Sequence, residues 1–209
     1  MPPERVTTLP RVSWQTYESL LQDYRGYNGA RLAYDRGILE IMSPGPDHEF
    51  ISQSITDIVT VAITEWDIDV TPLRSTTFRR ADVEAGFEPD SCFYIQNATA
   101  MRCRTEIDLS SGDPPPDLVI EVDVTHSSLD KFPIFARIGI AEVWQHREDG
   151  IRIFALTESV YREQDMSFAF PRLTQADLNR LLAQSATLRR PDWVRLVREW
   201  AQNASTEGQ

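Results

Sequence analysis

Apolar residues recur along the chain with two spacings, one typical of helices and one typical of strands. The segment from Asp47 to Trp66 carries apolar residues every three or four positions, which predicts a helix that packs on a core through one face. The same spacing predicts further helices over residues 13–24, 97–104, 127–138, 174–182 and 191–200. Short apolar runs predict strands over residues 31–34, 38–42, 68–73, 76–80, 90–95, 117–124, 141–146 and 150–156.

The order of these elements predicts an α/β (α+β) fold, in which a mixed β-sheet is flanked by α-helices. We expect an N-terminal β-hairpin over residues 31–42, because a glycine-containing turn separates its two strands. The expected organisation is an N-terminal tail (1–12), one domain (13–185), and a C-terminal helix with a frayed tail (186–209). The apolar stripe of the last helix suits either packing on the domain or a dimer contact.

The composition favours a cytoplasmic globular protein. Apolar residues make up 41% of the 209 positions, which is enough for a core. No apolar run approaches the ~18 residues of a membrane span, and the N-terminus lacks the apolar segment of a secretory signal. Cys92 and Cys103 are too few for a disulfide framework and do not form a zinc-binding pattern. The net charge of −11 argues against a basic surface, although an acidic protein can still hold a local basic groove or gather carboxylates around a metal.

Two acidic residues stand in predicted strands. Asp90 opens one strand, and Glu121 lies between isoleucine and valine in another. A buried carboxylate is costly unless it is paired or binds a cation. Strand alternation places Asp117, Glu121 and Asp123 on one face, but Asp117 lies about 13 Å from Glu121. Glu121 therefore needs a partner from a neighbouring strand, and Asp90 is the best candidate. Two carboxylates with water suit Mg²⁺, which seldom has a full set of protein ligands.

Lys131 is the only lysine: the chain has 21 Lys+Arg residues, and the other 20 are arginine. Lysine is a compact ammonium whose pKa responds to burial, whereas arginine is an always-charged planar fork. A single lysine soon after a carboxylate-bearing strand is a candidate for chemistry. The alternative is chance in an arginine-rich sequence, with Lys131 pairing with Asp130 on a solvated helix.

His48 and Glu49 stand in the first turn of the helix predicted from Asp47. His48 falls on the apolar stripe and Glu49 well off it. Both are possible supporting residues of a site at this helix end, although a histidine in this position is more often a capping or packing residue than a catalyst. The three histidines lack the spacing of a zinc site, and the chain has neither a P-loop nor the serine motif of α/β-hydrolases.

The stretch PPDLVIEVDVTHSSLDK over residues 115–131, with Phe135, Gly139 and residues 141–144 after it, resembles a large bacterial family of restriction endonuclease-like proteins. That family is assigned to the PD-(D/E)xK nuclease superfamily. Residues 34–37, 42–44, His48 and 89–90 agree with the family pattern in the same order. The resemblance runs from about residue 17 to residue 182.

The resemblance implies a restriction endonuclease-like core with Asp90 and Glu121 as metal ligands. It implies a Mg²⁺-dependent endonuclease, with Mn²⁺ as a possible substitute, that hydrolyses phosphodiester bonds of DNA, and a homodimer that supplies two sites. The superfamily lysine stands two residues after the glutamate, where this chain has Asp123. The family is believed to supply the lysine from the following helix, which is the place of Lys131.

The sequence leaves a second hypothesis open. A catalytically inactive nuclease fold could serve as a module for binding protein or nucleic acid, and both the negative charge and the displaced lysine favour it. In the enzyme, Asp123 would take an outer-sphere or second-metal role and also hold Lys131 charged, whereas Asp117 suits a structural role at the start of its strand.

Overall fold

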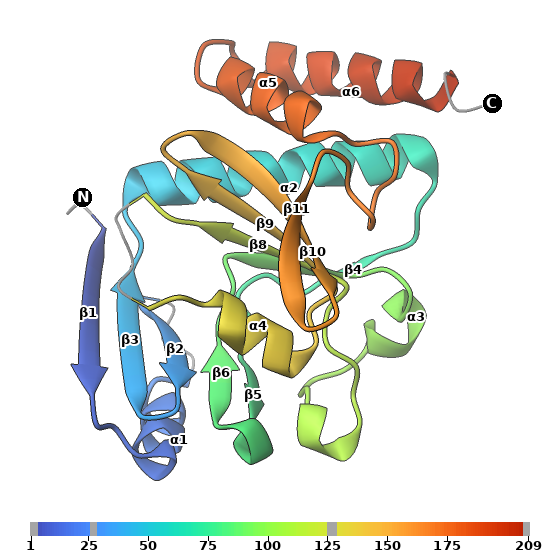
Figure 1. Cartoon of the computed structure of the whole chain (residues 1–209). Coiled ribbons are helices and arrows are strands. Elements are labelled where there is room, and N and C mark those ends of the chain that lie inside the picture. The colour runs from blue at the N-terminus through green and yellow to red at the C-terminus, as the bar shows by residue number, and fades with distance from the viewer. Residues whose placement is uncertain (1–3, 26–28, 125–128, 207–209) are drawn as a thin grey trace.

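Two β-sheets and the helices packed on them form the computed structural model, which describes residues 4–25, 29–124 and 129–206 (Figure 1). The strands are β1 (Arg5–Pro10), β2 (Arg31–Asp35), β3 (Ile38–Ser43), β4 (Thr71–Pro72), β5 (Phe78–Arg80), β6 (Ala85–Phe87), β7 (Ser91–Tyr94), β8 (Leu118–Val122), β9 (Glu142–Arg147), β10 (Gly150–Thr157) and β11 (Val160–Gln164). The α-helices are α1 (Trp14–Asp23), α2 (Pro46–Trp66), α3 (Ala98–Met101), α4 (Phe132–Ile138), α5 (Gln175–Ser185) and α6 (Arg190–Thr206).

The larger sheet is mixed, as the sequence predicts. Its strand order is β11-β10-β9-β8-β7-β4, in which only the β8–β9 pair is parallel among the described residues. Helix α4 lies in the connection between these two parallel strands, which is the crossover that a parallel pair requires. The predicted hairpin, β2 and β3, belongs to a second, antiparallel sheet of order β1-β3-β2-β6-β5. The expected α/β (α+β) class is confirmed.

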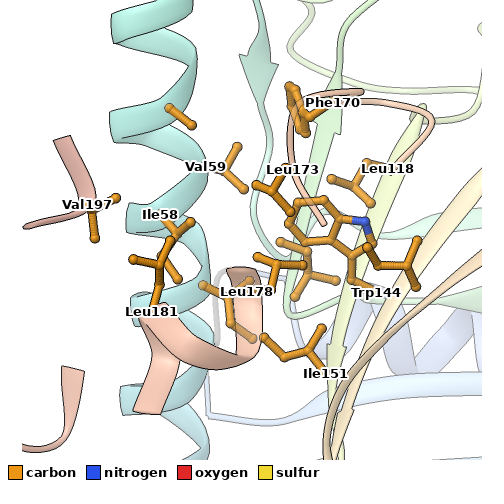
Figure 2. Packing of buried hydrophobic residues seen from close by; sticks show 14 of the residues in the cluster. Ile58, Val59, Leu118, Trp144, Ile151, Phe170, Leu173, Leu178, Leu181 and Val197 are labelled. Carbon is orange, nitrogen blue, oxygen red and sulfur yellow. The ribbon is translucent and has the colours of Figure 1, made fainter. Parts of the chain in front are cut away.

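Helix α2 covers one face of the mixed sheet, and α5 and α6 pack on the other side of α2 (Figure 1). The apolar stripe predicted from the sequence is the contact: Figure 2 shows Ile58 of α2 close to Leu181 of α5. Leu178 of α5 lies toward Ile151 of β10, and Trp144 of β9 is on the sheet side. All five side chains are buried. This cluster fixes the N-terminal end of α2, with His48, relative to β8.

The other face of the mixed sheet packs against α4 and the second sheet. Phe135 of α4 makes an edge-to-face contact with Phe87 of β6, with ring centroids 4.7 Å apart. Val119 of β8 and Val143 of β9 are buried in the same cluster. The second sheet therefore lies close to β8, so side chains from β2 and β3 can contribute to a site there.

Several boundaries differ from the sequence prediction. The strands expected over 68–73 and 76–80 shorten to β4 and β5, and the helix expected over 97–104 shortens to α3. Strand β1 occupies residues 5–10 of the expected tail and pairs with β3; its sequence RVTTLP has too few apolar residues to announce a strand. The sequence also gave no prediction for β6 and β11.

The helix that carries the candidate lysine begins later than expected. Residues 125–128 lie outside the described residues. Helix α4 begins at Phe132, after Lys131, rather than at residue 127, and it ends at Ile138 as expected. Pro133 explains the start, since proline lacks an amide hydrogen and is tolerated only in the first turn of a helix. Lys131 therefore stands at the N-cap position of α4 instead of within the helix.

The last helix is longer than expected. Helix α6 continues to Thr206, past the end at residue 200 that the sequence suggested. Ala201 is buried, and its carbonyl accepts a hydrogen bond from the indole nitrogen of Trp66 at 2.9 Å, which holds this part of the helix on α2. Among the described residues, no helix is long and apolar enough to cross a membrane.

Candidate active site

The two candidate metal ligands lie beside each other on neighbouring strands. Strands β7 and β8 are antiparallel with Ser91 opposite Ile120, so Asp90 and Glu121 come next in the same register. The backbone amide of Val122 donates to Oδ2 of Asp90 at 2.6 Å, which fixes the aspartate against β8. Both residues are 5% exposed. The structure thus brings together the pair that the sequence selected from separate strands.

Lys131 reaches this pair from the segment before α4. Its Nζ donates to Oε2 of Glu121 at 2.8 Å, and its side chain is 18% exposed. The alternative in which Lys131 pairs with Asp130 on a solvated helix is wrong, because Asp130 instead accepts a hydrogen bond from the backbone amide of Phe132. The only lysine of the chain is therefore half-enclosed beside the carboxylate of Glu121.

Burial shifts the pKa values of Glu121 and Lys131 in opposite directions, because it disfavours the charged form of each. Burial raises the pKa of Glu121, Lys131 lowers it, and the nearby Asp90 raises it again. The net result is a pKa of about 7. Burial lowers the pKa of Lys131, but Glu121 and Asp90 outweigh burial, so the pKa of the lysine lies above its ordinary value. Lys131 is therefore a fixed cation at neutral pH, suited to holding negative charge rather than accepting a proton.

Asp90 is held by Arg31 and His48. Oδ1 accepts a hydrogen bond from Arg31 of β2, and His48 of α2 places Nε2 3.1 Å from Oδ2. Burial raises the pKa of Asp90, but the hydrogen bond from His48 and the charge of Arg31 hold it below its ordinary value. Burial lowers the pKa of His48, and Asp90 reverses this, so the histidine pKa is raised. His48 is thus a site residue as well as a buried one.

The remaining predicted residues divide into rim, cavity and structural positions. Glu49 is half exposed and accepts from Nη2 of Arg31 at 3.1 Å. Asp123 follows β8, lines the same cavity as Glu121, and lies 3.5 Å from Nε of Arg147. Asp117 is not in the site: it stands before the opposite end of β8, and its carboxylate accepts from the backbone amides of residues 95 and 96 at 2.6 and 3.1 Å.

A small cavity adjoins Glu121 and Lys131. Its volume is about 40 Å³, room for about three water molecules. The residues that line it come from β1, β3, β8, β9 and α4 and from the segments next to them: Glu4, Val6, Glu40, Met42, Glu121, Val122, Asp123, Leu129, Asp130, Lys131, Phe132, Phe135, Gln145 and Arg147. Oε1 of Glu121 is buried and has no hydrogen-bond partner among the described residues. A carboxylate oxygen in that state is available to a ligand.

Sequence reasoning missed two residues of this region. The sequence around Arg31 does not indicate a site residue, because Arg31 stands at the start of an ordinary hairpin strand. Its contact with Asp90 arises only when the chain folds and brings β2 next to Asp90. Glu40 did give one: it interrupts an apolar strand pattern, as Glu121 does, and it is 2% exposed. Glu40 accepts from the backbone amide of Leu129 at 3.4 Å and adds negative charge near Lys131.

The donors of the site fit a hard divalent cation. Among the described residues, no group of three or more His, Cys, Asp and Glu side chains forms a metal-binding cluster. Mg²⁺ needs fewer, since it keeps several waters and takes one or two carboxylates. The unpartnered Oε1 of Glu121, next to the carboxylate of Asp90 and a water-sized cavity, meets that need. These residues would hold such an ion.

Comparison with known proteins finds matches that span most of the chain. The family model described as "Uma2: Putative restriction endonuclease" matches residues 14–189. Among solved structures, a crystal structure of "a putative nuclease belonging to DUF820" from Anabaena variabilis ATCC 29413 is 14% identical, covers 72% of this chain and 90% of that chain, and has a TM-score of 0.49. No curated protein matches the sequence.

Proposed function

Because the chain belongs to the family described as "Uma2: Putative restriction endonuclease", we propose that it is a Mg²⁺-dependent endonuclease that hydrolyses phosphodiester bonds of DNA. The observation that carries the proposal is the convergence of three groups from separate parts of the chain. Asp90 and Glu121 meet across β7 and β8, and the Nζ of Lys131 lies 2.8 Å from Glu121.

Each residue has a role in this proposal. Asp90 and Glu121 hold the cation, and Mg²⁺ when bound polarises the phosphate and lowers the pKa of a water. Lys131, a fixed cation, orients the attacking water or stabilises the negative charge that develops on the phosphate oxygens. His48 holds Asp90 in place through its 3.1 Å contact. Asp123 lines the cavity as an outer residue.

Nicking of supercoiled plasmid in Mg²⁺, with Mn²⁺ as a substitute, tests this function. We expect Lys131→Ala and Glu121→Gln to lower the rate by about 10²–10³-fold, the usual cost of removing one electrostatic group from a catalytic site. Lys131→Arg should also lose activity, because a planar fork does not reproduce a compact ammonium in an enclosed position. Arg152→Ala is the matched control, since it removes an exposed cation that pairs with surface acids.

The activity assay excludes the proposal if wild-type protein does not cut, or if all variants cut alike. Each preparation must first show the same cooperative unfolding as wild type, so that loss of activity is not loss of fold. Single-stranded DNA and RNA run beside the plasmid identify the nucleic acid. We propose DNA because the family description names restriction endonucleases.

One observation favours the alternative, a catalytically inactive module that binds protein or nucleic acid. Both oxygens of Asp90 already have partners, Arg31 at Oδ1 and the Val122 amide with His48 at Oδ2. The net charge of −11 also opposes tight binding to a polyanion. Titration calorimetry separates the two hypotheses. The enzyme binds Mg²⁺ or Mn²⁺ at wild-type Glu121 and not at Glu121→Gln, whereas the module shows no such difference.

Two further proposals follow from the family. A duplex has two strands, so we propose a homodimer that presents two sites; light scattering after size exclusion gives the mass, and a monomer at assay concentration would contradict it. We also propose a cytoplasmic location. Cys92 and Cys103 are free thiols, which suits a reducing compartment.

A further inference from the structure

Arg31 bridges a buried carboxylate and a surface carboxylate. One guanidinium nitrogen, Nη1, donates to Oδ1 of Asp90, and the other, Nη2, donates to Oε1 of Glu49 at 3.1 Å. The side chain of Asp90 is 1% exposed and that of Glu49 is 50% exposed. Arg31 itself is 14% exposed. The guanidinium therefore spans from the interior of the site to its rim.

This arrangement conflicts with a cation on Asp90. The Oδ2 atom of Asp90 is engaged by the Val122 amide at 2.6 Å and faces His48 at 3.1 Å, so a cation would have to use Oδ1, which has a single partner among these contacts. Arg31 donates to that oxygen. A divalent ion and a guanidinium on one carboxylate oxygen repel each other strongly where water is excluded. The same oxygen cannot serve both.

Glu49 offers Arg31 a second acceptor. It lies in the first turn of α2, next to His48 in sequence, and its exposed carboxylate remains solvated whether or not Arg31 is bound. Arginine has five donors in a fork, so it can leave Asp90 and retain Glu49. In this second position the guanidinium stays near the site, where a phosphate would be attracted to it.

We propose that Arg31 competes with the divalent cation for Asp90, and that Glu49 holds Arg31 at the rim when the cation is bound. The inference rests on the proposed function, which makes Asp90 a metal ligand. Arg31 is a positioning residue in this scheme: in the metal-free protein it occupies the ligand oxygen, and its release from Asp90 accompanies metal binding.

Calorimetric titration of Mn²⁺ into the metal-free full-length protein tests the proposal without measuring activity. If Arg31 occupies Asp90 most of the time, its removal in Arg31→Gln lowers the Kd for Mn²⁺ about tenfold, since only the open fraction binds. Arg147→Gln is the control for a general change of charge, because Arg147 lines the cavity next to Glu121, where it pairs with Asp123. We expect it to change the Kd by about twofold at most at 0.15 M salt.

Glu49 gives an independent measurement with the opposite sign. Glu49→Gln leaves Arg31 with Asp90 as its carboxylate partner, so we expect the Kd to rise about threefold. Asp47→Asn, which removes an exposed charge from the same helical turn, should leave the Kd unchanged. In the double variant Arg31→Gln/Glu49→Gln the Kd should equal that of Arg31→Gln alone, because Glu49 acts through Arg31.

The outcomes are distinct. The competition is overturned if Arg31→Gln and Arg147→Gln change the Kd for Mn²⁺ equally, or if Glu49→Gln still changes the Kd in the double variant. In either case the proposed function stands as long as the wild type binds Mn²⁺. Absence of Mn²⁺ binding in wild type and Arg31→Gln alike overturns both. If Arg31→Gln does not fold, Glu49→Gln against Asp47→Asn decides, since both change exposed side chains and an equal Kd for the two rejects the proposal.

Discussion

Two buried glutamates on neighbouring strands of the mixed sheet have opposite environments. Glu142, at the start of β9, is fully buried, and its two oxygens accept four hydrogen bonds: from the Trp144 indole at 2.6 Å, the Ser167 hydroxyl at 2.7 Å, and the backbone amides of residues 168 and 169 at 2.5 and 3.1 Å. Glu121, on β8, is held by Lys131 through Oε2 alone, and its Oε1 has no partner among the described residues.

The difference separates a structural carboxylate from a functional one. Glu142 compensates its burial with donors from its own strand and from the loop after β11, so it fixes that loop against the sheet. At Glu121, burial and the charge of Asp90 disfavour the ionised form of the carboxylate, and the side chain lines a cavity. Buried groups that stay unsatisfied in native proteins are concentrated at sites where a ligand completes them. The contrast can be tested at the level of stability, without any assumed substrate.

The largest expected effect concerns the two glutamates themselves. Glu142→Gln puts an amide that is itself a donor among four donors, and we expect it to lower the free energy of unfolding by about 3–4 kcal/mol. Glu121→Gln keeps an acceptor for Lys131 and removes a disfavoured charge, so its change at pH 8 should stay within about 1 kcal/mol. Urea unfolding in EDTA measures both. Equal losses would show that Glu121 is as structural as Glu142.

Metal should stabilise the protein through Glu121. At 100 times its Kd, Mg²⁺ raises the free energy of unfolding by about 2.7 kcal/mol if it binds only the folded state. We expect this gain to disappear in Glu121→Gln and to remain in Asp177→Asn, a control on α5 that is remote from the site. Thermal unfolding with and without Mg²⁺ provides the comparison. A gain that persists in Glu121→Gln would place the ion elsewhere.

Glu121 should also make the stability of the protein depend on pH. Burial raises the pKa of Glu121 to about 7 in the folded protein. Below pH 4 the group is neutral in both states and has no effect; between its unfolded and folded pKa values the unfolded state ionises first, so the wild type loses stability as pH rises. The slope is at most about 1.4 kcal/mol per pH unit, and it ends near pH 7.

Glu121→Gln removes this titration. In EDTA, the stability of wild type minus that of Glu121→Gln should therefore fall between pH 5 and pH 7 and then level off. The contribution of Lys131 is constant in this range, because its pKa is raised above its ordinary value. Urea unfolding at four pH values measures the slope. A difference that does not change with pH would mean that Glu121 ionises in the folded protein as it does in the unfolded chain.

The sequence predicted the elements that carry Glu121 and Asp90 because both stand in short apolar runs bounded by polar turns. It could not predict Arg31, whose role depends on the second sheet lying next to β8 and on no local pattern. Glu142 was also missed, although it stands in the strand predicted over residues 141–146, because most of its partners come from a loop more than 20 residues later. The two glutamates differ in the hydrogen-bond donors that they receive from residues distant in sequence. Neither the periodicity nor the composition of the chain predicts such donors.

The position of Lys131 illustrates the same limit in a milder form. Lys131 stood out as the only lysine, and the resemblance assigned it a role. The helix expected to carry it begins at Phe132, one residue after Lys131, because of Pro133. The N-cap position gives Lys131 its direction toward Glu121, and helical periodicity would have assigned it a different one. Local chemistry of a single proline thus decided what the apolar pattern left open.

The smallest expected effect extends the comparison to a partly exposed carboxylate. Asp177, in the first turn of α5, has partners as Glu142 does: Thr174 Oγ1 donates to it at 2.6 Å, and Arg180 pairs with it at 3.0 Å. Burial raises the pKa of Asp177, and the bonds from Thr174 and Arg180 outweigh burial and lower it. Its side chain is 25% exposed, so water replaces lost partners more easily than at Glu142.

We expect Asp177→Asn to cost about 0.5–1 kcal/mol at pH 7, the range of a helix N-terminal contact. A lowered carboxyl pKa gives stability that is present above the unfolded pKa and is lost as pH falls through the folded value. The cost of Asp177→Asn should therefore decline below pH 4, which urea unfolding at pH 7 and pH 3 measures. If Asp177→Asn cost as much as Glu142→Gln, partner number alone, rather than burial with partners, would set the value of a carboxylate in this fold.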